Sequence, residues 1–186
     1  MRVLLPWLRA SLMGALVMFA WGAFAHMLLL KGAGFARLDQ EDAVITELAR
    51  DIGREGLYFF PSLDFERTST PAENAAWEAK FARGPTGLVL FHPAGDAPVS
   101  LRKLTRQFLS EWLAALVVVW VLSLVVAPYW KRVLLTGALG AFACLSVSAL
   151  YWTWYGFPTA FFLAQCVDKV LGWTLAGALI ARRLPG

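Results

Sequence analysis

Residues 133–155 read VLLTGALGAFACLSVSALYWTWY, and residues 159–181 read TAFFLAQCVDKVLGWTLAGALIA. At about 1.5 Å per helical residue, each run is long enough to cross the roughly 30 Å hydrocarbon core of a bilayer. Gly156-Phe157-Pro158 lies between them, and Gly and Pro together end a helix and begin a turn. The two runs therefore predict a tight hairpin of transmembrane helices.

Two more apolar runs lie upstream, at residues 10–30 and 112–130. Of the whole chain, 59% is hydrophobic and 16% charged, against about 25% charged in an ordinary globular domain, and the mean hydropathy is +0.58. This composition excludes a soluble globular enzyme, a disordered chain and a disulfide-stapled secreted domain. The predicted fold class is a mainly α integral membrane protein with four transmembrane helices and a small α/β domain in the loop between the first two.

The first run resembles a signal peptide in part, because Arg2 and Arg9 precede it and Ala23-Phe24-Ala25 looks like a cleavage site. The apolar run continues to Leu30, however, and is longer than the usual 7–15 residues of a signal h-region. We expect an uncleaved anchor.

Basic residues flank the predicted helices at three places: Arg2 and Arg9, Lys131 and Arg132, and Arg182 and Arg183. With four spans all three flanks lie on one side, and the positive-inside rule makes that side cytoplasmic. Both termini are then cytoplasmic and residues 31–111, with ten basic and twelve acidic side chains, are outside. We expect a bacterial inner membrane.

The predicted domains are an anchor (1–31), an extracytoplasmic α/β domain (32–110) and a three-helix membrane region (111–186). Within the second, apolar spacing predicts a helix from Asp39 to Gly53. Thr70-Pro71-Ala72-Glu73 predicts a capped helix that ends at Gly84-Pro85, flanked by strands at 56–61 and 87–91. Ser100 caps a helix that runs into the second span. Strand, helix and strand suggest a βαβ unit with a right-handed crossover if the strands are parallel.

The predicted outer domain carries an aromatic set. These side chains either fill its small core or form a face that packs on the membrane region or on a partner. They are Phe59, Phe60, Trp77, Phe81 and Phe91.

The most unusual feature is the charged pair Asp168-Lys169 in the middle of the last span. Each charge at the bilayer centre costs about 2.5–3.5 kcal/mol on insertion scales, and neighbours on a helix point about 100° apart, so each is expected to need its own partner. Gln165 lies one turn away on the same face, and Ser146 is the nearest expected donor to Asp168. A packing role is favoured, and a proton relay or transport role through Asp168 is the alternative.

The remaining candidates are weaker. His26 lies near the outer end of the first span and His92 in the outer domain, where each is a possible ligand or, more simply, a satisfied or turn histidine. Cys144 and Cys166 are interpreted as small buried apolar side chains. Small residues four apart in the last two spans predict close helix packing within the hairpin or in an oligomer. No catalytic motif, metal site or cofactor site is expected.

We therefore expect a non-enzymatic accessory or interaction subunit of a membrane assembly, with the bilayer and a protein partner or second copy as its contacts and no nucleic acid. A small proton-coupled carrier using Asp168 is the first alternative. A membrane enzyme or cofactor site near His26 and His92 is the second.

Overall fold

The computed structural model describes residues 4–64 and 66–184, and Arg2 of the first basic flank lies outside them. The chain forms two compact units. Unit 1 comprises residues 1–36 and 97–186, and unit 2 comprises residues 37–96. Residues 32–36 and 97–110, predicted to belong to the outer domain, fall in unit 1. Residues 101–110 form the first turns of the helix that continues into the predicted second span.

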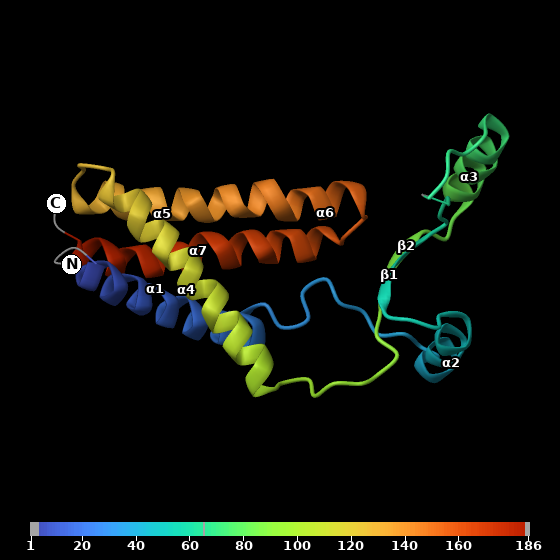
Figure 1. Ribbon diagram of the computed structural model, residues 1–186, viewed down its shortest axis with the longest axis horizontal. Coiled ribbons are helices and arrows are strands. Elements are labelled where there is room, and N and C mark those ends of the chain that lie inside the picture. The colour runs from blue at the N-terminus through green and yellow to red at the C-terminus, as the bar shows by residue number, and fades with distance from the viewer. Residues whose placement is uncertain (1–3, 65, 185–186) are drawn as a thin grey trace. The chain divides into compact units, whose positions relative to one another are not determined.

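Unit 1 is a bundle of four long helices (Figure 1). Helix α1 (Leu4–Phe24) continues through a π-helical segment, η1 (Ala25–Leu29), and α4 spans Leu101–Ser123. Helix α5 (Tyr129–Ala143) continues through η2 (Cys144–Ser148) into α6 (Ala149–Trp154), and α7 spans Thr159–Arg183. All four are long and apolar enough to cross a membrane, as the sequence predicted.

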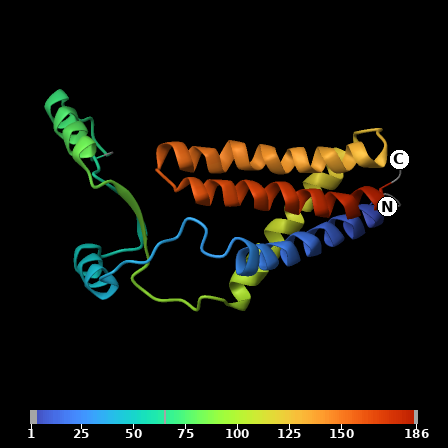
Figure 2. The same cartoon turned by 180° about the vertical axis from the view of Figure 1, so that it is seen from behind.

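The basic flanks gather at one end of unit 1, which we call the basic end. The start of α1, the connection between α4 and α5 and the end of α7 lie together there in both views (Figures 1 and 2). Tyr129 at the start of α5 donates a hydrogen bond to the carbonyl oxygen of Ala178 at 3.1 Å, and the buried Arg132 donates to that of Leu184 at 3.3 Å. The described residues of the three basic flanks, from Arg9 onwards, therefore lie at one end of unit 1, which is compatible with four crossings of a membrane.

The predicted second span is wrong at its end. Helix α4 stops at Ser123 rather than near Trp130, and α5 already begins at Tyr129. Pro128 lies immediately before α5, and a proline cannot continue a preceding helix because it lacks the N–H and disfavours helical geometry in the residue before it. As a result, Lys131 and Arg132 lie in the first turn of α5 and not in the loop between the two helices.

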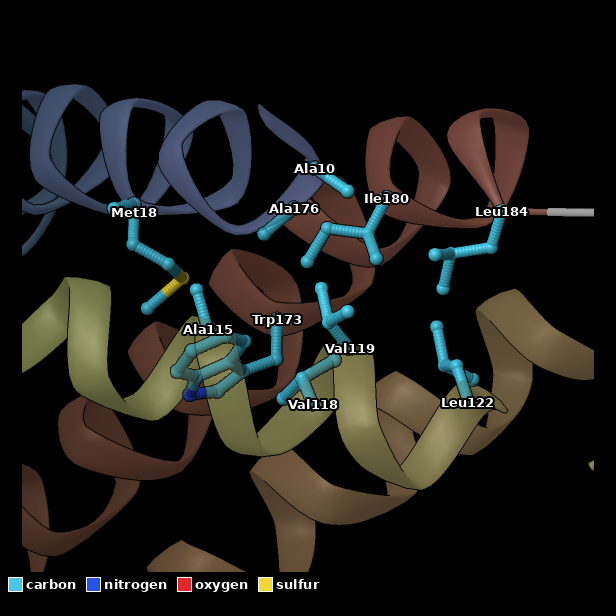
Figure 3. Close-up of a cluster of buried hydrophobic side chains, with 11 residues drawn as sticks. Ala10, Met18, Ala115, Val118, Val119, Leu122, Trp173, Ala176, Ile180 and Leu184 are labelled. Carbon is cyan, nitrogen blue, oxygen red and sulfur yellow. The ribbon is translucent and has the colours of Figure 1, made fainter. Parts of the chain in front are cut away.

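The core of unit 1 lies where α1, α4 and α7 meet (Figure 3). Met18 of α1, Val119 of α4 and Ile180 of α7 are at most 2% exposed there. Large apolar side chains on the outside of the bundle are exposed, such as Leu113 (62% exposed), Leu134 (64%) and Phe142 (69%). An exterior this apolar is typical of helices whose solvent is lipid.

The hairpin of α5 and α7 packs through glycines, as the spacing of small residues predicted. A Cβ added at Gly140 would collide with the backbone carbonyl of Lys169, and one added at Gly177 would collide with Thr136. Gly172 faces α1 instead, because its Cβ would lie 2.7 Å from the Trp21 ring. The small residues of α7 therefore serve two helix contacts, α5 on one side and α1 on the other.

Cys144 and Cys166 form a disulfide across this hairpin, so their interpretation as separate apolar side chains is wrong. Both residues fall at the same level of the antiparallel hairpin, which brings their Cα atoms to 5.2 Å. Sequence spacing could not show this, because the pairing depends on the register of two helices rather than on a short motif.

Unit 2 contains α2 (Glu41–Asp51), β1 (Gly56–Phe60), α3 (Pro71–Arg83) and β2 (Gly87–Phe91). The predicted elements are present, but the strands pair antiparallel, with Leu57 opposite Leu90 and Phe59 opposite Leu88. The suggested parallel βαβ crossover is therefore wrong. Because β1 and β2 run in opposite directions, the connection through α3 reverses the chain and does not return it to the same end of the ribbon.

The start of α3 is built as the sequence predicted. The Thr70 hydroxyl accepts from the Glu73 N–H at 3.3 Å, the Glu73 carboxylate accepts from the Thr70 N–H at 2.8 Å, and Pro71 occupies the first helical position. Arg67 pairs with the same carboxylate at 2.6 Å. These contacts lower the pKa of Glu73 to about 2, with the Arg67 hydrogen bonds as the largest cause.

Candidate functional site

Asp168 is the buried acid of unit 1, 2% exposed in the middle of α7. Its carboxylate accepts a hydrogen bond from the indole N–H of Trp21 on α1, with Nε1 to Oδ1 at 3.0 Å. The same N–H lies 3.1 Å from the Asp168 backbone oxygen. Trp21 reaches this position because Gly172, one turn along α7, leaves room for its ring. The prediction that Asp168 faces the bundle interior agrees with this geometry.

Lys169 contacts Asp168 directly, against the expectation that the two adjacent charges need separate partners. The Lys169 ammonium nitrogen lies 2.9 Å from Asp168 Oδ2. The helical angle separates the Cβ directions, but four flexible methylene groups let the lysine head curl back to its neighbour. This pairing lowers the net charge that the bundle must accommodate.

His26, from the π-helical segment η1, is the third group at this carboxylate. Its Nε2 lies 3.8 Å from Asp168 Oδ2, and its side chain is 54% exposed. His26 therefore connects Asp168 to the exterior of unit 1.

A pocket of about 360 Å³ lies in front of this cluster, between α1, α4 and α7. Its walls include apolar side chains such as Met18 and Phe19. Its polar lining comes from His26, Gln107, Glu111, Asp168 and Lys169. The Gln107 amide donates to the Glu111 carboxylate at 2.6 Å, so the second acid is oriented by its own helix, α4. Four titratable side chains from three helices thus face one pocket.

The other two polar candidates of the last spans lie outside this pocket. Ser146 is not the donor to Asp168, because its hydroxyl donates to the carbonyl oxygen of Phe142 at 2.7 Å and its side chain is exposed. Since Gly140 packs against Lys169, Ser146 lies more than a turn beyond the level of Asp168. Gln165 is half-exposed on α7 and is not among the residues that line the pocket.

The charged pair lies in the middle of α7, as expected. The pocket's other walls come from η1 and the first turns of α4, through His26 and Leu104. The site therefore lies near the end of α1 and α4 opposite the basic end.

His92 has a carboxylate partner in its own unit. Its Nδ1 lies 3.3 Å from Glu55 Oε2 at the edge of the ribbon, and both side chains are more than half exposed. Within residues 4–64 and 66–184, no cluster of three His, Cys, Asp or Glu side chains has the arrangement of a metal site. Each histidine is thus accounted for by one acid: Glu55 for His92, and Asp168 for His26.

Unit 2 presents a different candidate surface. None of its described residues is buried. Trp77 donates to the Pro61 carbonyl oxygen at 2.9 Å, and Phe81 packs on Phe59 with ring centroids 6.0 Å apart. Beyond this small aromatic contact, the cross-strand pair Leu57 and Leu90 is 63% and 68% exposed. The ribbon therefore carries an apolar patch that no other part of unit 2 covers, which we call the Leu57–Leu90 patch.

Sequence reasoning missed Trp21, which donates to Asp168, and the polar pocket residues Gln107 and Glu111. Trp21 lies inside an apolar run, where an aromatic residue is not unusual, and Glu111 directly precedes the apolar run at residues 112–130. One signal was present: Met18, Gly22 and His26 recur every four residues, which places a histidine and a small residue on one helix face. The spacing does not show which helices pack against this face of α1.

Searches against protein-family models, curated proteins and solved structures found no match to this chain.

Proposed function

We propose that the chain is an integral membrane protein that acts as an interaction subunit, with unit 2 as the part that docks on a partner protein. The observation that carries this proposal is the lack of any buried residue among those described in unit 2, combined with the open Leu57–Leu90 patch. A two-stranded ribbon is marginal by itself in water, and small domains bury too little surface to be stable alone. A partner that covers the patch supplies the missing burial.

The energetic argument favours a protein contact. Full burial of a leucine side chain contributes about 1.5–3 kcal/mol, so covering Leu57 and Leu90 is worth a few kcal/mol to the complex. The amphipathic helix α2 adds further uncovered apolar surface, with Ile45 52% exposed. Each strand of the ribbon also keeps one unpaired edge, to which a partner strand can add.

Site-specific photo-crosslinking in native membranes tests this proposal. A photoreactive residue at Leu57 or Leu90 is expected to give one discrete adduct with a different protein, identified by mass spectrometry. The matched control is Glu78, an exposed position on α3 away from the patch, which is expected to give none. Adducts made only of this chain would indicate a homo-oligomer instead, and equal labelling at Leu57, Leu90 and Glu78 would contradict a docking surface.

The proposed orientation places the basic end in the cytoplasm and unit 2 outside, in a bacterial inner membrane. It rests on the positive-inside rule applied to the clustered basic flanks. Cysteine labelling in a background without Cys144 and Cys166 tests it. An impermeant reagent added from outside is expected to label Thr68→Cys in unit 2 and to spare Val126→Cys, which is at the basic end and 95% exposed. The reverse pattern contradicts the orientation.

The pocket around Asp168 supports a second candidate function, proton-coupled transport. A half-exposed histidine 3.8 Å from a buried carboxylate is the arrangement that passes a proton from an exterior to an interior group. In reconstituted liposomes with a pH-sensitive dye, an imposed potential is expected to drive proton flux. Asp168→Asn should abolish this flux while the protein stays folded, because the amide oxygen still accepts from Trp21. Equal flux in Asp168→Asn and the parent protein would exclude this role.

A further inference from the structure

A groove at the basic end lies outside both functions proposed above. It has a volume of about 370 Å³ and is lined by Pro6, Arg9, Leu12 and Met13 of α1 together with Arg183 of α7. Two guanidinium groups from opposite ends of the chain therefore share one concave surface whose remaining walls are apolar.

The two arginines lack acidic partners. Both are exposed, and neither forms an ion pair with any residue in the described part of the chain. Residues 1–38 contain no acid, and the acids of the bundle, Glu111 and Asp168, both line the pocket near the opposite end. The neighbouring cation Arg182 behaves differently, because its guanidinium lies 5.6 Å from the centre of the Tyr129 ring. Arg9 and Arg183 thus form a local excess of positive charge.

The groove continues into an apolar ridge. Leu8, Leu12 and Leu16 follow one another at four-residue spacing on α1 and are 42–53% exposed. A ligand with an anionic head and a long apolar tail matches both parts, since paired guanidinium groups bind phosphate oxygens in a bidentate manner and an alkyl chain lies along leucines.

We propose that this groove binds an anionic phospholipid, with the phosphate between Arg9 and Arg183 and an acyl chain along the leucines of α1. The proposal rests on the proposed membrane insertion but not on the docking function of unit 2. Basic pockets at the cytoplasmic side of helix bundles are suited to anionic headgroups, which concentrate in that leaflet.

Native mass spectrometry of the full chain released from nanodiscs tests the proposal. The nanodiscs contain phosphatidylglycerol and phosphatidylcholine with identical acyl chains, and retained phosphatidylglycerol is expected to exceed phosphatidylcholine. The variant R9Q/R183Q should lower phosphatidylglycerol retention by roughly 25-fold, since each cation lost near a headgroup layer weakens binding about fivefold. R9K/R183K should retain part of the binding, because it keeps the charge and loses the bidentate fork.

The matched control is K131Q/R182Q, which removes the same charge from the same end of the bundle. Lys131 and Arg182 both lie over aromatic rings rather than in the groove, so this variant should keep at least half of the parent's lipid retention.

Equal losses of lipid retention in the two Gln variants would overturn the groove as the binding site and favour diffuse surface charge. Equal retention of both lipids would overturn it outright, and binding of inorganic phosphate without preference for phosphatidylglycerol would replace the lipid by a free anion. Failure of the protein to enter nanodiscs would overturn the proposed membrane insertion. The photo-crosslinking of unit 2 tests the docking function, and its result does not depend on lipid binding in the groove.

Discussion

Replacing Trp21 by Phe removes one hydrogen-bond donor from Asp168 while keeping an aromatic ring against Gly172. Hydrogen bonds to charged groups contribute about 1.5–3 kcal/mol in proteins, whereas interhelical bonds measured in a membrane average about 0.6 kcal/mol and reach about 1.7. The Trp21 hydrogen bond is 3.0 Å long, and its acceptor, Asp168, is only 2% exposed. The upper part of the range measured for interhelical hydrogen bonds therefore applies. We expect Trp21→Phe to lower the free energy of unfolding by about 1.5 kcal/mol.

A double-mutant cycle separates the charge from the ring. In an Asp168→Asn background the acceptor is neutral, and Trp21→Phe should cost roughly half as much, because neutral hydrogen bonds contribute about half as much as charged ones. Unfolding is measured in detergent by SDS titration. The control is Trp173→Phe, which removes similar ring volume from the core and should cost the same in both backgrounds. An identical cost of Trp21→Phe in both backgrounds would refute the argument that this bond stabilises a charge.

Three further outcomes follow from the geometry. Because the pKa of Glu73 falls from 4.5 to about 2 on folding, its contribution to α3 is complete above pH 4.5 and is lost as the pH falls towards 2. Amide exchange of α3 should follow that window, and Glu73→Gln should flatten it. Gly140→Leu should separate α5 from α7 and lower the free energy of unfolding by about 3 kcal/mol, because a backbone carbonyl cannot move aside as a side chain does. A melting temperature equal to that of the parent protein would disprove this contact. Cys144 and Cys166 should react with an alkylating reagent only after reduction, as seen by mass spectrometry of the intact chain, and labelling without reductant would contradict the disulfide.

The apolar runs and turn residues were sufficient to predict the helices, because length, hydropathy and the Gly156 turn are local properties. The Thr70 cap and both strands of unit 2 were predictable for the same reason. The end of α4 was misplaced because hydropathy counts Val125 and Val126 as span, while the helix stops before Pro128. Strand direction in unit 2 was beyond reach, since two short strands separated by a helix are compatible with either pairing.

The candidate site shows the same division. Asp168 and Lys169 stand out in the sequence because charges are rare in apolar runs. Their actual partners depend on helix register: Trp21 meets Asp168 where Gly172 leaves room for its ring, whereas Ser146 lies more than a turn beyond the level of Asp168 and is exposed. The contact between Lys169 and Asp168 was not expected, because the directions of the Cβ atoms alone leave out the flexibility of the lysine side chain. Register and side-chain flexibility are therefore the quantities that a single sequence does not supply.

The bond between Trp21 and Asp168 also has a consequence for the order in which the chain is made. The two residues are 147 positions apart, and at about 5–20 residues per second the ribosome takes roughly 7–30 s to travel from one to the other. Throughout this interval α1 is already synthesised, with its indole donor present and the acceptor not yet made. In the proposed membrane, the carboxylate of α7 would then meet an indole donor that is already present rather than bare hydrocarbon. The order of synthesis therefore gives α7 a hydrogen-bond donor for its buried acid as soon as that acid is made.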